Sequence, residues 1–161
     1  MRDSAFTEIA DDVSYPMYIV TAATRYEKAG CLVGFATQCS IDPPRFAIWI
    51  SKKNYTFRIA SAADVVAVHL TRHGDRELAE LFGSETGDDI DKFTRCRWRL
   101  GRGGVPVLTQ GDWFAGRVLQ HFDTGDHVGM LLDPFEGESN RIGVEPLGFQ
   151  DLRRIPPGHP A

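Results

Sequence analysis

The stretch that decides the fold is Gly30-Cys-Leu-Val-Gly-Phe-Ala-Thr-Gln-Cys-Ser-Ile-Asp-Pro-Pro44, followed by Arg45-Phe-Ala-Ile-Trp-Ile-Ser51. We expect one strand over Gly30 to Ile41, a turn at the two prolines, and a second strand at Phe46 to Ile50. The second run is almost wholly apolar, which is typical of a strand buried on both faces. A helix over Phe57 to Ala63 is predicted next, so the polar residues before it form a turn.

This polar turn contains two ammonium groups, one amide and three hydroxyls. Its residues are Ser51, Lys52, Lys53, Asn54, Tyr55 and Thr56. The first turn of a helix has unpaired backbone N–H groups and a partial positive charge, so such a turn is a ready site for a phosphate. The alternative is a solvated turn in which Asn54 or Thr56 caps the helix.

A hairpin is predicted downstream. Trp113 to Phe122 and Val128 to Leu132 are apolar runs joined by a polar turn, which places His127 where the second strand begins. Strands separated by hairpins, with convincing helices only at Phe57 to Ala63 and from Gly74 to Phe82, predict an antiparallel barrel or sandwich with helices in its crossovers.

Three motifs in order resemble the flavin reductase family. The first matches at Gly30, Val33, Thr37, Ser40, Asp42, Pro43 and Pro44; the second is the turn from Lys52 to Thr56; the third is Gly125-Asp126-His127. The resemblance covers about Tyr15 to Gly137. It implies a mainly β fold with helices in crossovers, namely an antiparallel Greek-key split β-barrel, in a homodimer.

The resemblance also implies a function. Family members use NADH or NADPH to reduce FMN or FAD, in some cases for a flavin-dependent monooxygenase partner. Two alternatives stay open: a non-enzymatic FMN-binding electron carrier, and a split-barrel interaction module that binds no flavin. The second is favoured by Leu32 and Gly34, which stand where many family members have Thr and Ser.

Site residues follow from the same resemblance. His127 is expected beside the flavin ring, oriented by Asp126, where an imidazole that titrates near neutrality can stabilise charge on the reduced flavin. Without the other motifs, His127 is a turn histidine that caps a strand. The expected cofactor-binding residues are Leu32, Val33, Gly34, Phe35 and Thr37 at the ring, and Ser51, Lys52, Lys53, Asn54, Tyr55 and Thr56 at the phosphate.

Composition limits the remaining classes. The 161 residues predict a single domain with its core at about 15–137 and a C-terminal extension at 138–161, part of it extended or disordered. A net charge of -4 argues against nucleic acid as a partner. No apolar run approaches membrane-spanning length, so we expect a soluble cytoplasmic protein that does not bind membranes.

Cysteine and histidine placement predicts no metal site. The three cysteines have no close Cys or His partner of the kind that zinc needs. On a single strand, Cys31 and Cys39 lie about 26 Å apart, too far for a disulfide. His69 alternates with valines and is expected as a core or edge histidine rather than a catalyst. Gly34 marks either a bulge or the close approach of another backbone or a ligand.

Overall fold

The computed structural model describes residues 4–84, 86–87, 90–109, 111–141, 143–156 and 158. Its strands are β1 (Tyr18–Ala23), β2 (Lys28–Val33), β3 (Ala36–Ser40), β4 (Arg45–Ser51), β5 (Val65–Leu70), β6 (Trp98–Leu100), β7 (Pro106–Leu108), β8 (Asp112–Asp123) and β9 (His127–Glu138). The α-helices are α1 (Ser4–Asp12), α2 (Tyr55–Ala62), α3 (Arg76–Ser84) and α4 (Phe149–Leu152), with short 3-10 turns at His73–Asp75, Lys92–Thr94 and Arg102–Gly104.

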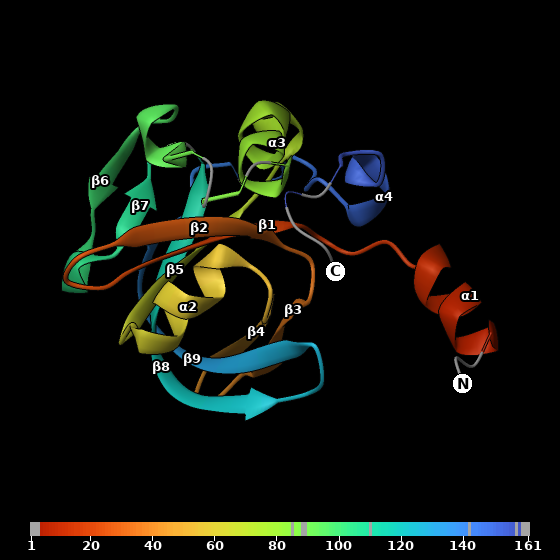
Figure 1. Ribbon diagram of the computed structural model, residues 1–161, viewed down its shortest axis with the longest axis horizontal. Coiled ribbons are helices and arrows are strands. Elements are labelled where there is room, and N and C mark those ends of the chain that lie inside the picture. Colours follow the sequence, from red (N-terminus) through yellow and green to blue (C-terminus); the bar gives the residue numbers. More distant parts are fainter. Residues whose placement is uncertain are drawn as a thin grey trace.

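Seven strands form one antiparallel sheet in the order β2-β1-β5-β8-β9-β4-β3, and β6 pairs with β7 in a second, small sheet. The sheet curls around α2, α3 lies over one end, and α1 extends away from the body (Figure 1). The predicted fold class, a mainly β split barrel with helices in its crossovers, is confirmed.

The core forms where α2 packs into the curved sheet. Ile59 and Ala60 of α2 are buried against Ile48 and Ile50 of β4 and against the apolar residues of β5. The apolar runs read from the sequence supply this surface, and burying aliphatic side chains is the main favourable term in folding.

The prediction of one strand over Gly30 to Ile41 is wrong. The segment forms β2 and β3, which lie at opposite edges of the large sheet, with Gly34 and Phe35 between them. A Cβ atom on Gly34 would lie 2.5 Å from the Tyr15 ring, so this glycine permits the close approach of an aromatic side chain. Here the chain leaves one sheet edge and crosses to the other.

The two cysteines of this segment therefore stand on different strands. Cys31 is buried in β2 and Cys39 is exposed in β3, and both are free thiols. The distance of about 26 Å expected for a single strand therefore does not apply to this pair.

The helix after the polar turn begins earlier than expected. α2 starts at Tyr55 rather than Phe57, because Asn54 is extended and its Oδ1 accepts a hydrogen bond from the Thr56 N–H at 2.9 Å. Asn54 is thus the N-cap, one of the two caps that the sequence allowed.

The C-terminal tail, expected to be extended or disordered in part, is packed against the body at residues 147–152. Leu147 and Leu152 are buried in a cluster with Met17 and Ala79. Leu147 also forms backbone hydrogen bonds, since its N–H donates to Thr71 O at 3.0 Å and its carbonyl accepts from Met17 N–H at 3.0 Å. This C-terminal segment is part of the folded body.

A buried ion network fastens the chain just before that segment. Arg72 Nε donates to Asp112 Oδ2 at 2.6 Å, and Arg141 forms a second pair with Asp75. Asp112 Oδ1 also accepts from the backbone N–H groups of Asn140 and Arg141, at 2.7 and 3.0 Å. The network joins the end of β5, the start of β8 and the chain after β9.

His69 is a core histidine, as predicted. Its Nδ1 lies 2.9 Å from Ile19 O, and its Nε2 accepts from Leu108 N–H at 3.0 Å, so the neutral ring bridges β1 and β7. Burial lowers the pKa of His69 to about 4, against a smaller opposing effect of the bond to Ile19.

In the described part of the chain, no helix is long and apolar enough to cross a membrane.

Candidate functional site

A cleft of about 310 Å³, the central cleft, opens where the β2–β3 connection, β4, the start of β9 and α4 meet. It is lined by Tyr15, Met17, Cys31, Leu32, Val33, Gly34, Phe35, Trp49, Ile50, Ser51, Asn54, His127 and Phe149. The lining is mostly apolar with a few polar groups, which is the usual make-up of a small-molecule site.

Strand pairing brings two of the three sequence motifs together here. The register of β4 against β9 places Ser51 opposite His127, and Lys52 N–H donates to Asp126 O at 2.9 Å. The polar turn and the Gly-Asp-His turn, more than 70 residues apart in the sequence, therefore share one end of the cleft.

His127 is held by its neighbour. Its Nδ1 lies 2.7 Å from Asp126 Oδ1, and the hydrogen bond from His127, together with the charge of the imidazolium, lowers the pKa of Asp126. With the carboxylate ionised, Nδ1 is the donor in this bond, so Nε2 is left for other partners. Asp126 itself is exposed and stands outside the central cleft, in a shallow hollow beside it.

Aromatic rings form one wall of the cleft. The rings of Phe35 and His127 lie 5.1 Å apart, and Trp49 lines both the cleft and the neighbouring hollow. Phe35 is 52% exposed, so part of its side chain is accessible to a ligand. A planar ring system could stack on such a wall.

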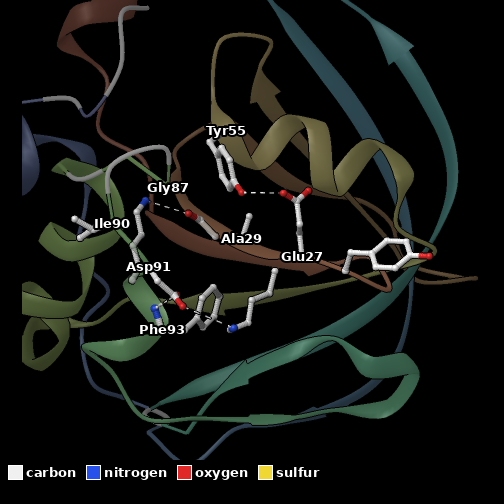
Figure 2. A pocket seen from close by; sticks show the side chains of 11 residues that line it. Glu27, Ala29, Tyr55, Gly87, Ile90, Asp91 and Phe93 are labelled. Carbon is white, nitrogen blue, oxygen red and sulfur yellow. Dashed lines mark hydrogen bonds and ion pairs between the residues drawn. The ribbon is translucent and has the colours of Figure 1, made fainter.

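The polar turn divides between the cleft and its surroundings. Of its six residues, Ser51 and Asn54 line the cleft. The Nζ of Lys52 pairs with Asp123 at 2.9 Å, and Thr56 is buried in the core. Tyr55 faces a separate side pocket, where its hydroxyl points to Glu27 at 3.4 Å (Figure 2).

Lys53 and Thr37 do not line the cleft either. The N–H of Lys53 donates to Ser51 Oγ at 3.3 Å, which closes the turn. Thr37 is exposed on β3, and its hydroxyl donates to Gln38 O at 3.0 Å. Of the residues predicted at the ring, Leu32, Val33, Gly34 and Phe35 do line the cleft.

Six cleft residues were not predicted from the sequence: Tyr15, Met17, Cys31, Trp49, Ile50 and Phe149. Tyr15 and Phe149 stack with their centroids 5.0 Å apart, and both line the cleft. Nothing local in the sequence marks this pair, because the two rings come from opposite ends of the chain. The apolar run that contains Trp49 and Ile50 was predicted as buried strand only.

The thiol of Cys31 is not set up for chemistry. Burial raises its pKa to about 11, with Lys92 and the Thr56 hydroxyl opposing the effect, so it stays protonated at neutral pH. Within the described ranges, no group of three or more His, Cys, Asp or Glu side chains is placed to hold a metal ion.

The fold and the site define a class of protein: a split barrel with an aromatic-lined cleft at the end of its longest hairpin. The chain belongs to the flavin reductase like domain family, whose model matches residues 10–154.

Curated relatives carry this domain within proteins of different lengths. A high molecular weight rubredoxin from Moorella thermoacetica is 30% identical over 134 residues, which is 79% of this chain and 58% of that protein. A ferric-chelate reductase (NAD(P)H) from Archaeoglobus fulgidus is 26% identical over 149 residues, 91% of this chain and 88% of that one. The chain thus spans little more than half of the rubredoxin.

Solved structures show the same fold. A flavin reductase domain protein from Arthrobacter sp. FB24 superposes with a TM-score of 0.82 and 20% identity, covering 92% of this chain and 91% of that chain. The split-barrel fold of this chain is therefore found in solved proteins that share little of its sequence.

Proposed function

We propose that this protein is a flavin reductase that uses NADH or NADPH to reduce FMN or FAD. The observation that carries the proposal is the central cleft, where an aromatic wall, two polar groups of the turn before α2 and an oriented histidine converge. Family membership and the relative named as an NAD(P)H-dependent reductase support it.

The cleft residues fit a flavin. A flavin combines a flat, largely apolar ring with a polar edge and a phosphate, and Phe35 and Trp49 offer the apolar wall. Asn54 is the N-cap of α2, and Ser51 ends β4 just before it. The first backbone N–H groups of a helix favour a phosphate nearby. A bound flavin would supply the hydride and electron transfer chemistry, and the protein would supply grip, orientation and access.

We propose that His127 stabilises negative charge on the reduced flavin ring. Asp126 fixes the ring through Nδ1, so that Nε2 can donate a hydrogen bond when the imidazole is protonated. In the cleft, such a donor would stabilise negative charge that develops on a reduced ring. We propose Asp126 as a positioning residue, because it holds His127 from outside the cleft.

We also propose the biological setting that family resemblance implies: a single-domain homodimer in the cytoplasm, with a flavin-dependent monooxygenase as one acceptor of reduced flavin. A second candidate function is an electron carrier with bound FMN. It is favoured by the similarity to the high molecular weight rubredoxin, the relative with 30% identity.

Oxidation of NADH and NADPH by purified protein, with and without FMN or FAD, tests the proposal through the nicotinamide absorbance. Turnover that saturates with flavin is the expected result and would name the cofactor pair. Tight flavin binding without turnover would favour the electron carrier, while the absence of any flavin binding would refute both.

A further inference from the structure

A second cavity continues the central cleft on the side of α4. This cavity, the adjoining cavity, has a volume of about 210 Å³ and shares Met17, Leu32, Asn54 and Phe149 with the central cleft. Its other lining residues are Phe82, Gly83, Thr86, Gly87, Lys92, Leu152, Arg153 and Ile155. Because the two spaces have four residues in common, a ligand longer than a ring system could occupy both.

The adjoining cavity is suited to an anion. Its charged lining residues are Lys92 and Arg153, and among the described residues that line it none is acidic. The ammonium of Lys92 is buried and donates to Gly30 O at 3.1 Å and to Phe82 O at 3.0 Å. The guanidinium of Arg153 is exposed and donates a long hydrogen bond of 3.4 Å to Gln150 Oε1.

Arg153 stands on a segment that is fixed to the body at several points. Phe149 N–H donates to Tyr15 O at 2.8 Å, and Arg76 Nη1 donates to Asp151 O at 3.1 Å. Leu152 is buried beside it, and Gly158 N–H donates to Gly83 O at 3.2 Å. A side chain on such a segment meets a ligand with little loss of backbone freedom.

The lysines expected at the phosphate are placed differently. Lys52 pairs with Asp123, and neither Lys52 nor Lys53 lines the cleft or the adjoining cavity. Arg153 instead lines the adjoining cavity, and Asn54, the N-cap of α2, lines the same cavity. The cation and the helix start can thus contact one anion from two elements.

We propose that Arg153 binds a phosphate group of the flavin nucleotide whose ring lies in the central cleft. The inference rests on the proposed function, which supplies the flavin. A planar guanidinium can donate two parallel hydrogen bonds to phosphate oxygens, which makes arginine well suited to this contact. The C-terminal segment therefore contributes to nucleotide binding through Arg153, in addition to lining the cleft through Phe149.

Titration of the flavin-free protein with riboflavin, FMN and FAD, followed by flavin fluorescence, tests this assignment. Arg153→Ala should weaken binding of FMN, FAD or both by about tenfold or more, since a hydrogen bond to a charged group is lost. Riboflavin has no phosphate, so its affinity should change less than about twofold. Arg153→Lys should keep part of the affinity because it keeps the charge.

Arg154→Ala is the matched control. Arg154 is an exposed arginine next in the chain, outside both cavities, and its loss should leave all three affinities within about twofold. Far-UV circular dichroism of each variant confirms folding. Loss for FAD alone would place Arg153 at the second phosphate, and equal loss for both nucleotides would place it at the phosphate they share.

Three results would overturn the proposal. Equal flavin affinities for wild type and Arg153→Ala would show that the guanidinium makes no phosphate contact. A raised KM for NADH or NADPH with unchanged flavin affinity would assign Arg153 to the nicotinamide nucleotide. If the wild-type protein bound none of the three flavins, the proposed function itself would fail, which is a different outcome from the first two.

Discussion

At the scale of single residues, the polar turn shows that residue type alone does not predict which side chains line the cleft. Lys52 and Asn54 are two residues apart, yet one pairs with Asp123 and the other lines the cleft. In a tight turn, successive side chains leave in different directions, so a cluster of polar residues marks a region and not a set of ligands.

Replacing His127 with alanine should slow NAD(P)H-dependent flavin reduction by about 10- to 100-fold, since it removes a donor aimed at developing charge. Flavin affinity should stay within about threefold, because the aromatic wall and the turn remain. Stopped-flow reduction and flavin titration separate the two effects.

His121→Ala is the control, since His121 is an exposed histidine of β8 that lies outside the central cleft. A wild-type rate for His127→Ala would leave His127 as a turn residue.

His69 should make stability depend on pH. Its pKa is about 4 in the folded protein and near 6.5 when unfolded, so between these values the unfolded state binds more protons. The free energy of unfolding should therefore rise with pH from about 4 to 6.5, by about 3 kcal/mol from this group, and then level off. Urea titrations at a series of pH values measure this dependence.

His69→Gln tests the cause. A glutamine amide can still donate to Ile19 O and accept from Leu108 N–H, but it does not titrate, so this part of the pH dependence should disappear. His121→Gln, at an exposed site, should leave the dependence as in the wild type. An unchanged slope in His69→Gln would show that other groups cause it.

At the scale of elements, the break between β2 and β3 decides the shape of the cleft. A strand may carry a glycine, but here Gly34 admits the ring of Tyr15 and the chain changes sheet edge. The same ring stacks on Phe149, so the β2–β3 connection and α4 are coupled through Tyr15.

Gly34→Ala should therefore destabilise the fold by about 1–3 kcal/mol, because its Cβ would lie 2.5 Å from the Tyr15 ring and force that ring to move. Displacement of the ring should also loosen the Tyr15–Phe149 stack and weaken flavin binding. Chemical denaturation and flavin titration measure the two effects.

Gly74→Ala is the matched control, since the nearest atom to its Cβ, in the Arg141 side chain, would lie 3.8 Å away, at ordinary contact distance. Its stability should change by less than about 1 kcal/mol. Equal effects at both positions would argue that Tyr15 adapts without loss.

At the scale of the whole molecule, buried charges join segments that are distant in the sequence. Burial alone would raise the pKa of Asp112, but hydrogen bonds from the Arg72 side chain and from two backbone N–H groups lower it overall. The carboxylate thus stays charged in the folded protein and ties the chain after β9 to β8 and to the end of β5.

Asp112→Asn should lower the free energy of unfolding by about 3–5 kcal/mol, because it leaves the buried guanidinium of Arg72 without its counter-charge. Urea denaturation measures the loss. Asp64→Asn, at an exposed position, should change stability by less than about 0.5 kcal/mol. A similar small effect for Asp112→Asn would show that the network contributes little.

Sequence alone determined the fold class, the apolar runs of β4, β8 and β9 and the cap region of α2, but it merged β2 and β3 into one strand. These features depend on local patterns, because strand alternation, turn residues and helix caps are short-range properties. The family resemblance also pointed to Leu32, Val33, Gly34 and Phe35, which line the cleft.

Only the tertiary structure decided which of these side chains share a cavity. The pairing of β4 with β9 places Ser51 opposite His127, and the ion pair with Asp123 holds the Lys52 side chain outside the cleft. The packing of α4 against the body places Phe149 and Arg153 at the adjoining cavity. Each outcome depends on contacts between segments roughly 70 or more residues apart, and the free energy of such contacts is set by register and packing, which no local pattern records.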